Sequence, residues 1–165
     1  MMITIHEATE NAWNDLRLIR LKALKADPTA FSSSYEKEIT YKDMEWQAYL
    51  SRQKKAVFLI YAHNNVIGLT GIMQKPERPE IAFIWGSWLD PAWRGQGLIT
   101  KAYQNCIAWA KAQKTIQKII ISHRASNQAS QKLIAKAGFQ FTHSENKIWP
   151  DGQNEKSLHY ELNIK

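Results

Sequence analysis

The sequence predicts an α/β domain with one mixed, mostly antiparallel sheet of six or seven strands and about four helices on both of its faces. Three observations predict this class. Apolar runs typical of strands alternate along the chain with runs that have the helical period. The 165 residues are 44% hydrophobic, which is enough to bury one core. No internal repeat or low-complexity segment is present, so we expect a single domain over residues 1–165.

Turn and capping residues divide the first half of the chain into its elements. Asp27-Pro28 ends a run of apolar residues with helical spacing. Thr40, three residues before an aspartate, predicts the capped start of a second helix. Asn64-Asn65 lies between two apolar runs and predicts a hairpin turn. The elements expected here are a strand at 3–6, helices at 13–24 and from Thr40 to about Arg52, and strands at 56–62 and 66–73.

Prolines and glycines divide the second half in the same way. Pro76 and Pro79 break the chain before a long apolar strand. Asn127 predicts the N-cap of a later helix, which Gly138 ends. The elements expected here are a strand from Ile81, a helix from the glycine-rich turn to about Gln113, a strand at 116–123, a helix at 127–138, and a hairpin that joins 139–149 to 158–162 across Asp151-Gly152.

The turn Arg94-Gly95-Gln96-Gly97 joins the long strand to the next helix and carries the strongest functional signal. Glycines let a bulky anion approach the backbone, Arg94 offers a fork of donors, and uncapped N–H groups with the helix dipole point at one spot. No third glycine follows Gly97 in the register of the dinucleotide fingerprint, and no Gly-Lys-Ser/Thr completes a P-loop. The turn therefore predicts another phosphate-bearing ligand, and an ordinary flexible strand-to-helix turn is the alternative.

These residues resemble a known family. Arg94 to Leu98 is similar to the pyrophosphate-binding signature Arg/Gln-x-x-Gly-x-Gly/Ala of the GNAT-type N-acetyltransferases. Residues 85–91 resemble the family's fourth strand, which splays away from its neighbour, and 126–139 resemble its Asn-x-x-Ala-x-x-Leu-Tyr-x-x-x-Gly-Phe segment. Residues 16–31 are similar to the opening helix and substrate loop of many bacterial members. The resemblance covers nearly the whole chain and implies a GNAT-like fold with acetyl-CoA as acyl donor.

The resemblance also implies roles for particular residues. Loop amides from Arg94 to Thr100 would hold the pyrophosphate, Trp88 and Leu89 would align the pantetheine arm near an oxyanion-binding N–H, and Asn127 would lie at the pantetheine or adenine end. The expected cofactor-binding residues are Trp88, Leu89, Arg94, Gly95, Gln96, Gly97, Leu98, Ile99, Thr100 and Asn127.

Two residues depart from the family pattern. Ile99 replaces the usual Gly or Ala beside the pyrophosphate. Ile134 replaces a tyrosine thought to protonate the departing CoA thiolate. Substitute donors, each of which also fits a structural role, are Tyr103, His123, His143 and Tyr160.

Glu80, at the start of the fourth strand, is the expected catalytic residue. Acyl transfer to an amine needs a general base within direct or one-water reach, and some family members place a glutamate at a similar position. A solvent-facing glutamate beside Pro79 is the alternative. The residues Tyr35, Glu36 and Glu38 either line the acceptor pocket, as the corresponding family loop does, or belong to a solvated loop.

Composition limits the partners. The 22 Lys and Arg against 15 Asp and Glu give a net charge of +7, which suits a polyanion such as CoA, but the basic residues are scattered, so we expect no nucleic-acid partner. The single thiol, Cys106, cannot form an internal disulfide and fits a buried helix stripe. No metal-ligand spacing, signal-like segment or long apolar run is present, so we expect no metal, no membrane partner and a cytoplasmic protein.

The expected function is transfer of an acetyl group from acetyl-CoA directly to a primary amine in a ternary complex. The acceptor stays open between a small molecule and a peptide or protein N-terminus. A homodimer formed through a sheet edge is also open. The alternative function, motivated by Ile99 and Ile134, is a CoA-binding sensor or regulatory module with weakened catalysis.

Overall fold

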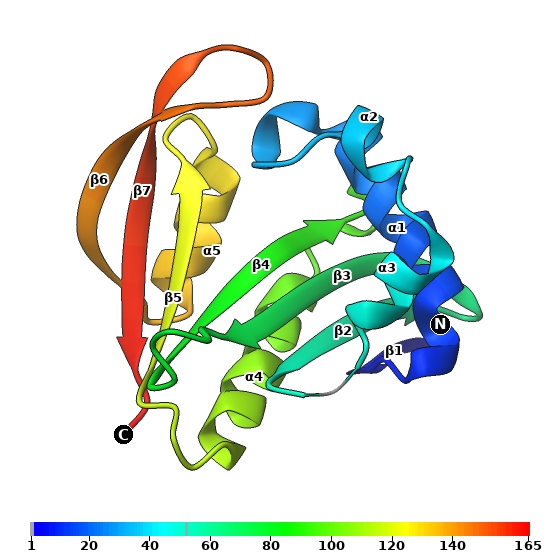
Figure 1. The fold of residues 1–165 in the computed structure, drawn as a ribbon, viewed down its shortest axis with the longest axis horizontal. Helices are drawn as coiled ribbons and strands as arrows, with labels where there is room; N and C mark the ends of the chain where they lie inside the picture. Colours follow the sequence, from blue (N-terminus) through cyan, green and yellow to red (C-terminus); the bar gives the residue numbers. More distant parts are fainter. Residues whose placement is uncertain (1, 52) are drawn as a thin grey trace.

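The computed structural model describes residues 2–51 and 53–165 and has one seven-stranded sheet at its centre (Figure 1). The strand order is β1-β2-β3-β4-β5-β7-β6, and in this part of the chain every neighbouring pair is antiparallel except β4 with β5. The strands are β1 (Ile3–Glu7), β2 (Lys55–Ala62), β3 (Asn65–Gln74), β4 (Ile81–Leu89), β5 (Lys118–Arg124), β6 (Gln140–Ile148) and β7 (Asn154–Asn163).

Helices cover both faces of the sheet, as the sequence predicts (Figure 1). On one face Leu16 and Trp46 pack against Leu69, and on the other Cys106 and Ile134 pack against the opposite side of the strands. The helices are α1 (Trp13–Ala26), α2 (Tyr35–Glu38) and α3 (Asp43–Ala48) on the first face, and α4 (Leu98–Ala112) and α5 (Gln128–Lys136) on the second. The predicted fold class and the order of the main elements are confirmed.

The segment around Thr40 differs from the sequence prediction. The expected capped helix from Thr40 is the shorter α3, which begins at Asp43 and has no side-chain cap. The Thr40 hydroxyl instead donates to the carbonyl of Lys37, because a helical turn, α2, precedes it and the Ser34 hydroxyl caps that turn. Arg52, the predicted end of the helix, lies outside the described residues.

The first hairpin turn lies one residue earlier than predicted. Asn65 already belongs to β3 and pairs with Ala62, so the turn residues are His63 and Asn64. His63 adopts a φ of +57°, the left-handed conformation that such tight turns require.

Burial decides the state of the single thiol. Cys106 lies on α4 with no exposed surface, and this burial raises the pKa of the thiol to about 12. The thiol is therefore an inert part of the core, as the sequence predicts. No helix among the described residues combines the length and the apolar character needed to span a bilayer.

Strands β4 and β5 run together for only three residue pairs and then separate (Figure 1). The pairs are Ile81 with Lys118, Ala82 with Ile119 and Phe83 with Ile120, after which β5 continues alone beside β7. The carboxyl half of β4 therefore pairs only with β3 among the described strands, which leaves polar backbone groups available on its other side.

A bulge in β4 lies within this open half. Trp85 of β4 pairs with Gly71 of β3, and Trp88 pairs with Leu69, so Gly86 and Ser87 together lie opposite a single β3 residue. Gly86 has a φ of +71°, which favours glycine. The bulge reverses the direction of the side chains that follow it.

Candidate functional site

A cavity of about 570 Å³ opens between the diverging ends of β4 and β5. Its walls are the end of β4, the glycine turn, the first turns of α4, the start of α5 and the loop that follows α1. The volume falls within the range of about 300–1,000 Å³ that is typical of small-molecule sites.

The glycine turn supplies backbone donors to this cavity. Gly95 and Gly97 have φ values of +85° and +76°, and a Cβ on either would meet no atom within 4 Å. The glycines are therefore required by the backbone conformation rather than by the packing. Gly97 is the N-cap of α4 without a side-chain cap, and the first intrahelical bond runs from the Lys101 N–H to its carbonyl. The N–H groups of the first turn thus lack intrahelical acceptors, as an anion site requires.

Thr100 adds a side chain to the same turn. Its hydroxyl oxygen is buried, and it has no hydrogen-bond partner within residues 2–51 and 53–165. Thr100 also lines the cavity. A buried hydroxyl without a partner loses the hydrogen bonds it makes to water, so a bound polar ligand would compensate for that loss.

Arg94 fixes the turn against the end of β4. Its Nε donates to the Leu89 carbonyl at 2.8 Å, and its Nη2 donates to Oδ2 of Asp27 at 3.1 Å. The guanidinium also lies 5.8 Å from the centre of the Trp88 ring. These contacts use two of the three guanidinium nitrogens, so Arg94 orients the turn as well as adding positive charge to it.

The structure brings the predicted cofactor-binding residues together, with one exception. Among the described residues, all ten line the cavity except Gln96, whose side chain is exposed to solvent. Asn127 also caps α5, because its Oδ1 accepts the N–H of Ser130 at 3.1 Å. Its side-chain NH₂ is not part of this cap.

The structure places Glu80 far from the cavity. Glu80 precedes β4 and is hydrogen-bonded to Arg78, and its side chain is 37% exposed. Ser87 is the first β4 residue that lines the cavity, and seven residues at about 3.3 Å each separate the two by about 23 Å. A hydrogen bond from its own backbone N–H and then the bond from Arg78 lower the pKa of Glu80, which weakens it as a base.

Of the four candidate proton donors, the structure brings Tyr103 to the cavity wall. Burial raises the pKa of the Tyr103 hydroxyl to about 12, against a smaller opposing effect of its hydrogen bond with Ser87. The hydroxyl therefore keeps its proton near neutral pH. His123 and Tyr160 bond each other at 3.0 Å, and His143 is exposed on β6.

The two departures from the family pattern have different surroundings. Ile99 is only 8% exposed and lines the cavity, so its branched side chain is part of the wall. Ile134 is 1% exposed and packs in the core behind Leu133, which lines the cavity in its place. Neither isoleucine can donate a proton to a ligand.

Sequence reasoning missed Asp27 as a site residue. Asp27 is the only acidic residue among the described residues that line the cavity. Its Oδ2 accepts the indole N–H of Trp88 at 2.6 Å as well as the bond from Arg94. In the sequence Asp27 marks the end of a helix and lies in the segment that resembles the family's substrate loop, but its partners lie more than sixty residues away.

Glu38 also has surroundings that differ from both sequence interpretations. It neither lines the cavity nor belongs to a solvated loop, because it is 2% exposed and forms a two-bond ion pair with Arg20. The Nε–Oε1 and Nη2–Oε2 distances are 2.9 and 3.0 Å. The Arg20 guanidinium lies 5.0 Å from the Phe31 ring centre and 5.8 Å from that of Trp85. This pair holds the segment after α1 against α1 and β4.

A second cavity of about 560 Å³ lies on the α3 face of the sheet. Aromatic side chains from the residues that flank α3 and from β4 line it, including Tyr49, Phe83 and Trp85. It shares no lining residue with the first cavity within the described chain. The glycine turn lines only the first of these two cavities.

Comparison with known proteins agrees with this geometry. A family model for an acetyltransferase (GNAT) domain matches residues 5–140. No curated protein matches the chain. Among solved structures, a GNAT-family acetyltransferase from Streptococcus pneumoniae has a TM-score of 0.86 at 18% identity, covering 99% of this chain and 100% of its own.

Two Salmonella typhimurium structures share the fold. An acetyltransferase that modifies the N-terminal serine of ribosomal protein L7/L12 has a TM-score of 0.79 at 20% identity, covering 100% of this chain and 96% of its own. The putative acetyltransferase yncA, solved with acetyl-CoA, has a TM-score of 0.83 at 16% identity, covering 100% and 95%. With the family match over most of its length, this chain belongs to the GNAT family of N-acetyltransferases, which take the acetyl group from acetyl-CoA and need no metal for the transfer.

Proposed function

We propose that this enzyme transfers the acetyl group of acetyl-CoA directly to a primary amine while both substrates are bound. The observation that carries the proposal is one cavity in which the uncapped N-terminus of α4 meets the open half of β4. The first feature suits a diphosphate, and the second offers backbone groups to an extended arm.

The donor would lie along the cavity from the glycine turn to the β4 bulge. The turn from Gly95 to Thr100 would hold the pyrophosphate through backbone N–H groups. The pantetheine arm carries amide groups, which can pair with backbone left unpaired where β5 diverges near Trp88 and Leu89. Lys136, which also lines the cavity, adds positive charge for the CoA phosphates.

The reaction exchanges a C–S bond for a C–N bond, and the nitrogen loses a proton while the sulfur gains one. The amine nitrogen attacks the thioester carbonyl carbon, and a backbone N–H of β4 near Trp88 or Leu89 stabilises the oxyanion. The C–S bond then breaks, and its electron pair leaves on the CoA sulfur. Tyr103, protonated and at the cavity wall, is the supported donor to that thiolate, with solvent as the alternative.

The cavity carboxylate Asp27 is better supported as the proton acceptor than Glu80. A base must lie within hydrogen-bond or one-water reach of the amine, and Asp27 lines the cavity whereas Glu80 lies about 23 Å along the strand from Ser87. The negative charge of Asp27 would also attract the ammonium form of the acceptor, before that ammonium group loses its proton. Its bonds to Trp88 and Arg94 fix the carboxylate in place.

The acceptor belongs to one of two classes, a small-molecule amine or a peptide N-terminus. The structural relative from Salmonella typhimurium that modifies the N-terminal serine of L7/L12 gives the second class a precedent on this fold. A panel of both classes therefore tests the proposal.

A second function, a CoA-binding module with weakened catalysis, is favoured by one observation. The position of the family tyrosine holds Ile134, which is buried in the core and away from the cavity. Such a module would bind acetyl-CoA through the same turn without releasing thiol in response to amines.

The deciding experiment measures thiol release from acetyl-CoA with small amines and with peptides that begin with serine or alanine. Binding of acetyl-CoA is measured in parallel by calorimetry. We expect amine-dependent release for at least one acceptor, a fall of about 100-fold in kcat/KM for Asp27→Asn, and little change for the matched variant Glu80→Gln.

The other outcomes separate the hypotheses. Binding without amine-dependent release supports the module. A loss in Glu80→Gln with an active Asp27→Asn restores Glu80 as the base and rejects Asp27. Absence of acetyl-CoA binding at about 1 mM rejects the assignment of the cavity altogether.

A further inference from the structure

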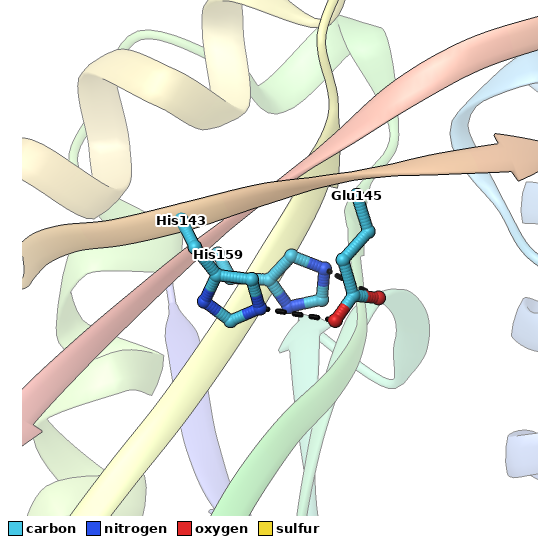
Figure 2. Close-up of side chains that lie close together, drawn as sticks. All are labelled: His143, Glu145 and His159. Atoms are coloured by element: carbon cyan, nitrogen blue, oxygen red, sulfur yellow. Dashed lines mark hydrogen bonds and ion pairs between the residues drawn. The ribbon is translucent and has the colours of Figure 1, made fainter.

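Two histidines and a glutamate gather on the outer hairpin (Figure 2), and none of them lines the first cavity. His143 and Glu145 lie on β6, and His159 lies on β7. His143 pairs directly with His159 across the two strands, and Glu145 is two residues further along β6. Because side chains alternate along a strand, all three project from the same face of the hairpin.

The spacing of their ligand atoms suits a small metal ion. The Nε2 of His143 lies 3.0 Å from Oε1 of Glu145, and the Nε2 of His159 lies 3.5 Å from Oε2. The ligand atoms of the three residues all lie within 4.8 Å of one another. A tetrahedral zinc ion with bonds of about 2.0–2.2 Å holds its ligand atoms about 3.4 Å apart. Small side-chain rotations would therefore bring all three onto one ion.

Thr142 orients the first histidine toward this point. Its hydroxyl donates to the backbone carbonyl of His159 at 3.1 Å and lies 2.9 Å from Nδ1 of His143. The Thr142 hydroxyl therefore contacts both the His159 backbone and the His143 ring, which fixes the orientation of that ring. Nε2 of His143 faces Oε1 of Glu145, and an outer hydrogen bond to the other ring nitrogen is typical of metal-binding histidines.

His159, the second histidine, also has a ring nitrogen that faces Glu145. The Nε2 of His159 is buried, and it has no hydrogen-bond partner in the described part of the chain. The two imidazole rings stack with their centres 4.5 Å apart. Two imidazole nitrogens that face one carboxylate are favourably placed when a cation lies between them. A proton on one ring is the simplest such cation, and a metal ion is the other.

We propose that His143, Glu145 and His159 bind one divalent cation of the zinc class. Two imidazole nitrogens and one carboxylate oxygen match the ligands that zinc prefers, whereas magnesium and calcium prefer oxygen alone. His143 and Glu145 are 53% and 61% exposed, so the ion would keep a water molecule as its remaining ligand. None of the three lines the first cavity, so the ion would not take part in acetyl transfer.

The ion would link the outermost strand of the sheet to its neighbour. β6 pairs only with β7 among the described strands, and its register shifts between Phe141 and His143. A bulge weakens the ladder at that point, so a bond across the two strands would hold β6 in place. Lys147, the nearest lysine along β6, is engaged with Ser32 and the Trp149 ring.

The test titrates zinc chloride into the chelator-treated full chain by calorimetry, with magnesium chloride in parallel. We expect one zinc ion per chain with a roughly micromolar Kd, no magnesium binding, and a higher unfolding temperature with zinc. Each of the variants His143→Gln and Glu145→Gln should weaken zinc binding at least about tenfold. The control His6→Gln, an exposed histidine on β1 that stacks on Tyr61, should leave it unchanged.

Two results would overturn the proposal. No zinc binding up to about 1 mM would leave a proton as the cation between the rings and the carboxylate. Zinc binding that survives in both variants, or that disappears in the His6 control, would place the ion elsewhere on the chain. Neither result depends on the acetyl-transfer assignment, which the thiol-release assay tests separately.

Discussion

The buried ion pair between Arg20 and Glu38 allows a sharp test of what holds the segment after α1 in place. The substitution Glu38→Gln keeps the shape of the side chain and removes its charge. Arg20 is only 9% exposed, and its Nη1 already has no partner among the described residues. The guanidinium would then be a buried charge without a counter-ion.

The expected cost follows from this burial. Removing one partner of a buried ion pair costs about 3–5 kcal/mol, because the other charge stays desolvated. For a chain of 165 residues, the entropy of unfolding near the midpoint temperature is roughly 0.35 kcal/mol per kelvin. The unfolding temperature of Glu38→Gln should therefore fall by about 9–14 °C.

The assay is thermal unfolding followed by circular dichroism. As a control, Arg78→Gln removes an exposed pair with Glu80, whose side chains are 59% and 37% exposed, and should cost less than about 1 kcal/mol. The double variant Arg20→Met/Glu38→Leu replaces the pair by apolar groups and should recover most of the loss. If Glu38→Gln unfolds no earlier than Arg78→Gln, the pair is not a buried interaction of this kind.

Three further predictions concern the turn, the donor and the acid range. Gly97→Ala should weaken acetyl-CoA binding several-fold by calorimetry, because a φ of +76° costs an alanine about 1 kcal/mol; unchanged affinity would contradict the role of the turn. Tyr103→Phe should lower kcat and leave the KM for acetyl-CoA unchanged; equal kcat would make solvent the donor. The hydrogen bond from Ser126, followed by that from Arg124, lowers the pKa of Glu155 below its ordinary 4.5, so this carboxylate stabilises the fold above that pH and loses its effect as pH falls. Glu155→Gln should flatten the fall of unfolding temperature below about pH 4.5, and an unchanged acid limb would refute this.

Local signals explain why much of the fold, and most residues of the cavity wall around the glycine turn, could be predicted. Gly97 needs a left-handed backbone, and the side chain of Asn127 caps a helix, so each marks its element from a few neighbouring residues. The predicted CoA residues are mostly contiguous in sequence. A strand, a turn and a helix that follow one another must meet at one end of the sheet, which brings those residues to one cavity.

The proposed base could not be predicted in the same way, because its partners are distant in sequence. Asp27 reaches the site through bonds to Trp88 and Arg94, which no local pattern reveals. Glu80 is close in sequence to the part of β4 that lines the cavity. An extended chain advances about 3.3 Å per residue, so the seven residues from Glu80 to Ser87 span about 23 Å. The cluster of two histidines and a glutamate was not predicted for a related reason, since its third member lies on the neighbouring strand.

At the β4 bulge, the two-residue period of a strand no longer predicts which face of the sheet a side chain occupies. Ile84 packs on the α4 face and Trp85 on the α1 face, so an unbroken alternation would place Trp88 on the α4 face and Leu89 on the α1 face. The structure has the opposite arrangement, because the bulge at Gly86 and Ser87 inserts one residue.

This reversal connects the buried ion pair to the donor site. It turns Trp88 toward the loop after α1, where its indole N–H reaches Asp27. A Cβ on Gly86 would lie 3.3 Å from Nη1 of Arg20, so the guanidinium packs directly against the bulge. Glu38 holds that guanidinium in place from its other side. Stability of the segment after α1 and alignment of the cavity wall therefore depend on the same few contacts, which is why a substitution at Glu38 should affect both.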